Sequence, residues 1–202
     1  GTNWPSWGRS MHLEALNEHY ITKFSRQMDM DPMLFVPGEG KGESPKLVLV
    51  GEAPGEQETR MRRPFVGKAG KNLDGFLDTL DLAREDIYIT NVVKIRPTKQ
   101  SERGCLSNRP PNRREKEAFT PWLMEEIGIL RPRLIVTLGN TPLQALMGEQ
   151  ALIGGCHGQL MRSADGWPVF ALYHPAAIIY NRALADTYQH DLQLLKQQLE
   201  TA

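Results

Sequence analysis

The stretch GEAPGEQETRMRRPFVGKAG at residues 51–70 decides the fold and marks the first candidate site. It follows KLVLV at residues 46–50, a short apolar run typical of a strand that is buried on both faces. Glu52 comes directly after that run, and the glycines and prolines beyond it predict a tight loop that leads into a helix. Ligands of open α/β sheets bind beyond the carboxyl ends of the strands. The stretch is therefore either a binding loop with a functional carboxylate or an ordinary connection with an incidental glutamate.

Strand-like segments alternate with amphipathic helical segments along the chain. We predict strands at residues 46–51, 86–91, 133–139 and 168–173, and helices at residues 10–28, 67–82, 113–130, 140–147 and 184–199. This order predicts an α/β fold with a mostly parallel sheet and helices on both faces. Between these elements we expect a long basic loop at residues 92–112, a Gly-rich turn region at residues 154–166, and a kink or fresh start at Pro121.

The composition is typical of a globular protein without transmembrane helices or a disulfide framework. No apolar run approaches the roughly 18 residues that a transmembrane helix needs. The amino terminus lacks a basic head followed by an apolar stretch, so we expect no signal peptide. The only cysteines, Cys105 and Cys156, are interpreted as ordinary thiols and favour a reducing compartment. We therefore expect a cytoplasmic, monomeric protein.

Charge is balanced over the whole chain but unevenly distributed along it. The chain holds 24 Lys or Arg and 24 Asp or Glu, whereas residues 60–114 hold 13 cationic and six acidic side chains. A basic face on a neutral protein attracts a polyanion such as DNA. The alternative is a solvated region whose cations are neutralised by acids that lie nearby in the fold.

Polar side chains follow three of the four predicted strands. Glu52 follows the first strand, Asn91 ends the second and His174 follows the fourth, whereas the third ends at Gly139, which brings no functional group. Parallel strands end at a common edge of a sheet, so we expect these three side chains to converge. A carboxylate can orient water or stabilise a cation, an imidazole can donate to a developing anion, and an amide can read a base edge.

Each candidate also has a purely structural interpretation. Asn91 can cap a turn, His174 can be a hydrogen-bonded core histidine, and Phe65, which can stack on a planar ligand, can instead belong to the core. The sequence contains no cluster of cysteines or histidines at metal-ligand spacing, no serine nucleophile elbow and no phosphate-binding loop. The candidates fit a hydrolysis in which water attacks and the protein stabilises charge, without a metal.

Five motifs then follow one another at compatible spacing. They are GEAPG at residues 51–55, RPFVGKAG at 63–70, ITNVVKIRP at 89–97, LG at 138–139 and HPAA at 174–177. Together they closely resemble the uracil-DNA glycosylase superfamily, most of all its family 4 enzymes, over roughly residues 46–199. The resemblance implies a three-layer α/β/α sandwich with a four-stranded parallel central sheet. We expect a single domain over residues 1–202, in which residues 1–45 add an amino-terminal helix and loop.

The resemblance also implies a reaction and assigns roles to individual residues. The reaction is cleavage of the N-glycosidic bond of uracil in DNA, which leaves an abasic site. Glu52 and His174 correspond to the catalytic acid and to the histidine that stabilises the departing uracil anion. The residues expected to bind the base or support its pocket are Ala53, Pro54, Glu58, Phe65 and Asn91. The residues expected to contact DNA are Arg63, Lys68, Lys94, Arg96, Arg109, Ile178 and Ile179.

The isoleucine pair stands where an apolar wedge follows the His-Pro motif in the family. A wedge assists base flipping because it replaces stacking that costs about a few kcal/mol to break. The alternative is that Ile178 and Ile179 belong to the core.

The sequence departs from the family pattern at the cysteines. The family 4 pattern implies a four-iron cluster held by four cysteines, but Ile95 and Phe119 stand at two of those positions. Residues 29–37 lack the amino-terminal pair, and Cys105 lies in an apparent insertion at residues 98–107. We therefore expect no iron-sulfur cluster, no other cofactor and no metal, and we expect other packing to order the same loops.

Three functions remain open at this point. The first is a glycosylase that removes uracil, or other deaminated bases as well, from single- or double-stranded DNA. The second is a protein that binds nucleic acid or an altered base without cleaving it, and the third is a hydrolase of free nucleosides or nucleotides. The basic segment favours a polymeric substrate, and the set of Glu52, Asn91 and His174 favours catalysis over binding alone.

Overall fold

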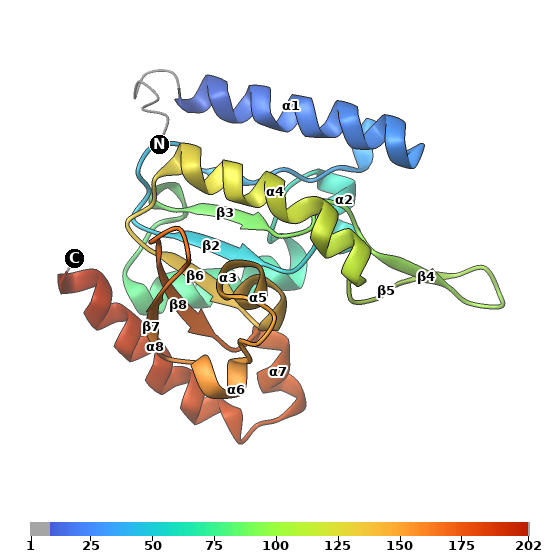
Figure 1. The fold of residues 1–202 in the computed structure, drawn as a ribbon. Coiled ribbons are helices and arrows are strands. Elements are labelled where there is room, and N and C mark those ends of the chain that lie inside the picture. The colour runs from blue at the N-terminus through green and yellow to red at the C-terminus, as the bar shows by residue number, and fades with distance from the viewer. Residues whose placement is uncertain (1–8, 202) are drawn as a thin grey trace.

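The centre of the protein is a layer of four parallel strands (Figure 1). The computed structural model describes residues 9–201, so residues 1–8 and 202 of the expected domain lie outside it. The four strands are hydrogen-bonded in the order β3-β2-β6-β8 and every one of their residues except Pro168 is buried. They are β2 (Val48–Gly51), β3 (Tyr88–Asn91), β6 (Ile135–Leu138) and β8 (Pro168–Leu172).

Two short antiparallel strands extend this sheet at its edges. β1 (Glu39–Gly40) pairs with β3, and β7 (Leu160–Arg162) pairs with β8. The expectation of a four-stranded parallel sheet is therefore correct for the centre, whereas the whole sheet is mixed and has six strands. Strands of two and three residues are too short for an alternation of apolar and polar residues to reveal them.

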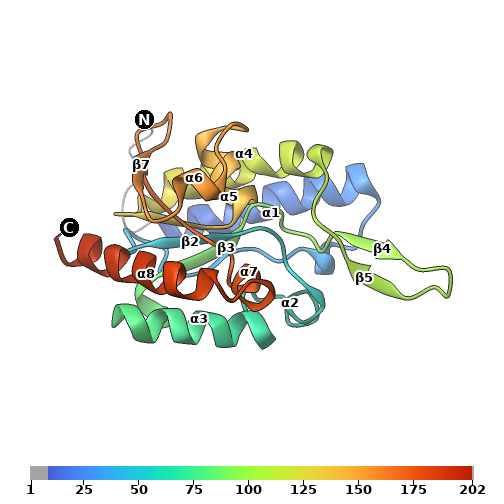
Figure 2. The same cartoon turned by 90° about the horizontal axis from the view of Figure 1, so that it is seen from below.

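Helices cover both faces of the sheet, as Figure 2 shows from a second direction. One face carries α1 (Arg9–Met28), α4 (Arg113–Leu130) and α5 (Asn140–Met147). The other carries α3 (Gly67–Leu80) and α8 (Leu184–Thr201). Val48 and Val50 point into the first core, and their neighbour Leu49 points into the second. The expected three-layer α/β/α arrangement is confirmed.

The first core contains a cluster of aromatic rings from α1, from α4 and from Phe35. Tyr20 and Trp122 are stacked with their ring centroids 5.2 Å apart, and Phe24 and Phe119 lie 4.9 Å apart. Phe35 packs against both Phe119 and Trp122. These rings join the two outer helices to each other and to the sheet.

Several short elements lie where loops were expected. Helices α2 (Glu56–Met61) and α7 (Pro175–Tyr180) have six residues each, and α6 (Ile153–Cys156) has four. The 3₁₀ turns are η2 (Pro32–Leu34) and η3 (Arg84–Asp86). Elements of this length bury no apolar stripe, so hydrophobic periodicity does not detect them.

The basic loop at residues 92–112 contains a hairpin, formed by β4 (Thr98–Gln100) and β5 (Leu106–Asn108). Helix α4 runs without a break through Pro121, which is exposed, so the predicted fresh start after Thr120 is wrong. An exposed proline leaves the carbonyl one turn earlier open to water, which lowers the cost of the missing hydrogen bond. Within residues 9–201, no helix is long and apolar enough to cross a membrane.

Candidate active site

Three predicted side chains converge at the carboxyl edge of the parallel strands. The last residues of β2 and β3, Gly51 and Asn91, are paired in register, and Glu52 follows Gly51 directly. His174 follows β8 and is the N-cap residue of α7. A carboxylate, an amide and an imidazole therefore share one edge of the sheet, as the strand ends predict.

Gly51 lies between the amide of Asn91 and the ring of Phe65. A Cβ atom built on Gly51 would stand 2.5 Å from Asn91 Oδ1 and 2.8 Å from Phe65 Cζ. Neither approach is possible for a real side chain, so only glycine lets both groups lie against this strand end. Asn91 is 4% exposed, whereas Phe65 is partly buried. A ring and an amide side chain therefore lie close together over the bare backbone of Gly51.

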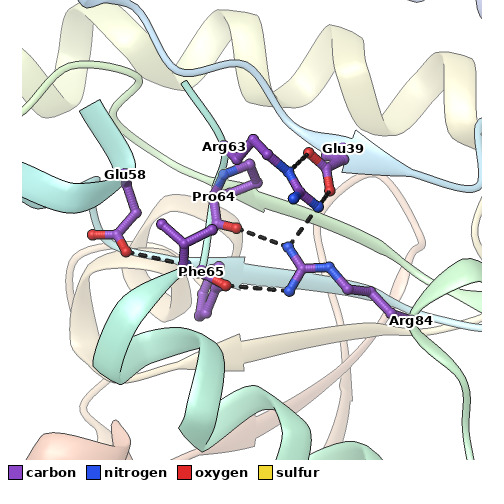
Figure 3. A network of polar contacts seen from close by, with 7 residues as sticks. Glu39, Glu58, Arg63, Pro64, Phe65 and Arg84 are labelled. Carbon is purple, nitrogen blue, oxygen red and sulfur yellow. Dashed lines mark hydrogen bonds and ion pairs between the residues drawn. The ribbon is translucent and has the colours of Figure 1, made fainter. Parts of the chain in front are cut away.

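The loop that carries Phe65 is held from two sides. Glu58 Oε1 accepts a hydrogen bond from the Gly55 N–H at 3.0 Å, and Glu58 Oε2 accepts one from the Val66 N–H at 3.1 Å. From the other side, Arg84 donates to the carbonyls of Pro64 at 3.0 Å and Phe65 at 3.2 Å (Figure 3). Glu58 thus ties the start of α2 to the residue that follows Phe65.

The backbone of Phe65 is strained, which explains why this loop needs bracing. Its φ is 54°, in the left-handed region that ordinary residues rarely adopt. Such a residue costs about 1–3 kcal/mol and persists only when its surroundings impose the conformation. The bonds from Arg84 and to Glu58 supply that constraint, so the ring is presented in a fixed position.

Arg63 is engaged by an acid on the surface. Its guanidinium forms two bonds with Glu39, at 2.6 and 2.8 Å, and Arg84 lies 3.5 Å from the same carboxylate. These bonds, chiefly the one from Arg63, lower the pKa of Glu39. Figure 3 shows that Glu39 connects the two arginines beside the Phe65 loop. Arg63 remains partly exposed, with 48% of its side chain accessible.

The carboxylate of Glu52 is oriented by a helix on the opposite side of the strand from the loop of Phe65. Thr141 Oγ1 donates to Glu52 Oε2 at 2.6 Å, and Thr141 lies in the first turn of α5. Glu52 is only partly buried, so its carboxylate keeps access to water. The sequence pattern does not indicate Thr141, because the two residues are 89 positions apart.

The imidazole of His174 is held in one tautomer when it is neutral. Its Nδ1 accepts a hydrogen bond from the Ala176 N–H at 3.0 Å, so the proton of the neutral ring is on Nε2. Although part of His174 is exposed, desolvation by the surrounding protein lowers the pKa of its imidazole, and Coulombic attraction to Glu52 opposes that shift. In this tautomer the neutral ring offers its Nε2–H as a hydrogen-bond donor.

Gly139 supports this arrangement, although the sequence predicts no role for it. Its φ is 82°, and a Cβ on it would stand 3.3 Å from the Cβ of His174. The left-handed backbone and the close approach both favour glycine at this strand end. The dipeptide Leu138-Gly139 does not by itself indicate that Gly139 lies against His174.

The two remaining base-pocket residues form the turn after β2. Pro54 is buried, and Ala53 is partly buried against the first core. Both lie between Glu52 and the start of α2 at Glu56. They set the path of the backbone directly after Glu52.

Most of the expected DNA-contacting residues lie on the surface. Lys68 is exposed in the first turn of α3, and Ile179 in α7 has 71% of its surface exposed. Ile178 differs from its neighbour because it is partly buried against the second core. The core interpretation therefore applies in part to Ile178, whereas Ile179 is exposed.

Arg96 and Arg109 stand at the root of the β4–β5 hairpin. Arg96 Nε donates to Asn108 Oδ1 at 2.6 Å. Arg109 forms two bonds with Glu115, at 2.6 and 3.0 Å, which raise the pKa of Arg109 and lower that of Glu115. Part of the basic segment is thus neutralised by nearby acids, in line with the alternative interpretation of its charges.

The expectation that Lys94 contacts DNA is wrong, because Lys94 is buried. Its side chain is fully buried, with Nζ 3.0 Å from Glu126 Oε1 and 5.4 Å from the centre of the Trp122 ring. Nζ also donates to the backbone carbonyl of Asn91. Burial lowers the pKa of Lys94 and the Glu126 carboxylate opposes that shift. This cation stabilises the segment after β3 from inside and does not reach the surface.

The residues present do not fit the iron-sulfur cluster that the family resemblance implies. Ile95 and Phe119, at two of the cysteine positions, are 4% and 0% exposed inside the first core. Cys105 is exposed on the hairpin, and Cys156 lies in α6. Two cysteines so placed cannot supply four thiolate ligands. Within residues 9–201, no group of three or more His, Cys, Asp or Glu side chains is arranged to hold a metal ion.

The fold is a three-layer α/β/α arrangement in which Glu52, Asn91 and His174 share the carboxyl edge of the parallel strands. Residues 37–197 match the family model of the uracil DNA glycosylase superfamily, and the chain belongs to that superfamily.

Its relatives include several type-4 uracil-DNA glycosylases. That of Pyrobaculum aerophilum is 42% identical over 166 residues, which cover 79% of this chain and 80% of the relative. That of Archaeoglobus fulgidus is 37% identical over 79% of each chain. That of Sulfurisphaera tokodaii is 35% identical over 92% of this chain and 84% of the relative. These relatives therefore match the chain over most of their own length.

Proposed function

We propose that this protein hydrolyses the N-glycosidic bond of uracil in DNA and leaves an abasic site. The observation that carries the proposal is the meeting of the Asn91 amide and the Phe65 ring over Gly51, at the same sheet edge as Glu52 and His174. The names of the type-4 relatives support uracil as the base.

The base is recognised by stacking and by hydrogen bonds. Uracil stacks on Phe65, a contact that is worth about 1–3 kcal/mol. Asn91 carries a donor and an acceptor side by side, which match the O4 acceptor and the N3–H donor of uracil. The turn at Ala53 and Pro54 closes the pocket beside the base. Because Asn91 is almost fully buried, a base that leaves its amide unpaired is disfavoured.

The two catalytic residues stabilise opposite charges as the bond between C1′ and N1 breaks. The bonding electron pair moves into the uracil ring, and the charge that develops on O2 accepts a hydrogen bond from His174 Nε2. The sugar becomes cationic, and the Glu52 carboxylate stabilises it and orients the attacking water. The water oxygen bonds to C1′, and the proton that water loses neutralises the uracil anion through the solvent.

The polymeric substrate is held by the surface around this edge. Exposed Ile179 is the wedge that enters the stack when the nucleotide flips out, and Ile178 supports it from the core side. Exposed Lys68 provides positive charge for phosphates. Arg63, Arg96 and Arg109 lie around the same edge, although Arg63 and Arg109 are paired with Glu39 and Glu115. Lys94 is not part of this set, because it is buried.

We also propose that this protein acts without an iron-sulfur cluster. We further propose that it is a monomer and that it acts in the cytoplasm. The loops that a cluster would brace are instead held by the aromatic core around Phe119 and Trp122 and by the Lys94–Glu126 ion pair. Iron analysis and visible absorption of the purified protein test the first part, and iron bound in a fixed ratio to protein would contradict it.

One assay separates the three candidate functions. The protein is incubated with uracil-containing single- and double-stranded oligonucleotides and with free deoxyuridine, and abasic sites are then cleaved with alkali. A glycosylase gives strand breaks at uracil and leaves the free nucleoside intact. Binding without breaks at stoichiometric protein identifies a binding protein, and release of uracil from the free nucleoside identifies a nucleoside hydrolase.

A further inference from the structure

The β4–β5 hairpin projects from the body of the protein at the edge where the candidate active site lies. Figures 1 and 2 both show it extending past α2 and the ends of the central strands. All side chains from Ser101 to Asn108 are exposed, including Leu106, of which 58% is accessible. Its tip contributes no residue to either core. The fold therefore does not require these residues for packing.

The root of the hairpin is nevertheless held firmly. Arg109 Nε donates to the Thr98 carbonyl at 2.8 Å, and the same guanidinium is bound by Glu115 of α4. Arg96 holds the side-chain oxygen of Asn108 at 2.6 Å. An isolated two-stranded hairpin is marginally stable in water, so these bonds are needed to fix its direction.

The root also lies beside the catalytic turn. Asn108 Nδ2 is 3.5 Å from the position of a Cβ on Gly55, three residues after Glu52. The segment from the end of β3 at Asn91 to the start of β4 at Thr98 joins the base-reading amide directly to the hairpin. An arm anchored at these two points has a defined place relative to a nucleotide in the pocket.

The hairpin carries a small excess of positive charge. Residues 98–108 contain Lys99 and Arg103 against a single acid, Glu102. Lys99 and Arg103 are both exposed, in contrast to Arg96 and Arg109, which are bound at the root. Exposed cations on a ribbon whose root is held in place are complementary to the phosphates of DNA.

We infer that the hairpin is a DNA-binding arm that contacts phosphates of the duplex on one side of the flipped nucleotide. The inference rests on the proposed function for its substrate, but DNA binding is measured separately from excision. The width of a two-stranded ribbon also matches a major groove of about 12 Å, which lets the arm follow the duplex.

The test is the double variant K99E/R103E. It should weaken binding to a fluorescent duplex of about 25 base pairs by about tenfold or more, and it should reduce the slope of log Kd against log salt by about one for each phosphate that the arm no longer neutralises. Excision of uracil from a single-stranded oligonucleotide too short to reach the arm should be unchanged. Slower excision on that short substrate would contradict an arm that acts only on flanking DNA.

A matched control makes the same charge change elsewhere. Lys46 and Arg133 are exposed and precede β2 and β6, at the opposite edge of the sheet. The variant K46E/R133E should bind the duplex nearly as well as the wild type. Equally weakened binding in the two double variants would overturn the inference, because net charge would then explain the effect.

The two proposals can fail separately. In one case, the wild type binds DNA more tightly than K99E/R103E does but releases no uracil. That result would refute the proposed glycosylase function and would support the inference about the arm. In the opposite case, the wild type removes uracil from the duplex, but K99E/R103E binds DNA with the same affinity and the same salt dependence as the wild type. That result would overturn the inference about the arm and would leave the proposed glycosylase function intact.

Discussion

Lys94 and Glu126 form an ion pair in which neither side chain is exposed to solvent, with Nζ and Oε1 3.0 Å apart. Tyr88 and Thr90, from the adjacent strand β3, donate their hydroxyls to the same carboxylate. The lysine in turn donates to the backbone carbonyl of Asn91, whose side-chain oxygen lies beside Gly51. A buried charge pair thus positions Asn91, the residue that we propose to read the base, from within the core.

Removing one member of this pair should be strongly destabilising. Lys94→Met leaves Glu126 as an unpaired buried charge, and we expect the free energy of unfolding to fall by about 3–5 kcal/mol. The double variant Lys94→Met with Glu126→Gln removes both charges and should recover most of that stability. Urea unfolding of the two variants checks this, and a single variant as stable as the wild type would contradict the account.

Gly51→Ala should impair excision while the protein stays folded. The added Cβ would meet Asn91 Oδ1 and the Phe65 ring at less than contact distance, so one of these groups must move. A displacement of about 1 Å in a binding site can cost about 10²-fold in rate. Gly75→Ala in α3 is the matched control, because a Cβ there meets nothing within 4 Å. Equal single-turnover rates for Gly51→Ala and Gly75→Ala would refute the role of Gly51.

Asn91→Asp should relax the recognition of uracil toward cytosine. A carboxylate accepts a hydrogen bond from the 4-amino group of cytosine but cannot donate to the O4 of uracil. The ratio of excision rates on matched uracil and cytosine oligonucleotides is the measurement. An unchanged ratio would count against Asn91 as the reader of the base edge.

The pKa of His174 should lie below the ordinary histidine value of about 6.5. Because the folded-state pKa is lowered, the unfolded chain binds the proton more readily, so His174 contributes less stability as pH falls from the unfolded pKa through the folded one. NMR titration of the imidazole measures the value directly. Glu52→Gln should lower it further, since the Glu52 carboxylate opposes the shift in the wild type. A pKa that rises in this variant would contradict the Coulombic contact.

The common edge of Glu52, Asn91 and His174 is predictable from the sequence. Each follows or ends an apolar strand, and strands joined by helices run parallel and end together. The alternation of strands and helices predicts the three layers for the same reason. Contacts made across long stretches of chain are not predictable in this way: Thr141 reaches Glu52 over 89 positions, and Arg84 reaches Phe65 over 19.

Lys94 shows where a count of charges along the chain misleads. Its segment is basic, which groups it with surface cations, but its neighbours Val92, Val93 and Ile95 are all buried. A lysine flanked by apolar residues on both sides is a signal of burial that a charge count ignores. The hairpin is not predictable from the sequence either, because its strands are mostly exposed and carry no alternation of apolar and polar residues.

The most direct test of the central claim is single-turnover excision of uracil from a defined oligonucleotide by the wild type and by Glu52→Gln and His174→Ala. We predict alkali-sensitive breaks at uracil with the wild type, and rates lower by about 10²-fold or more with each variant, because each variant lacks a group that acts in the transition state. Absence of breaks with stoichiometric wild-type protein bound to the DNA, or variants as fast as the wild type, would contradict the assignment of this site.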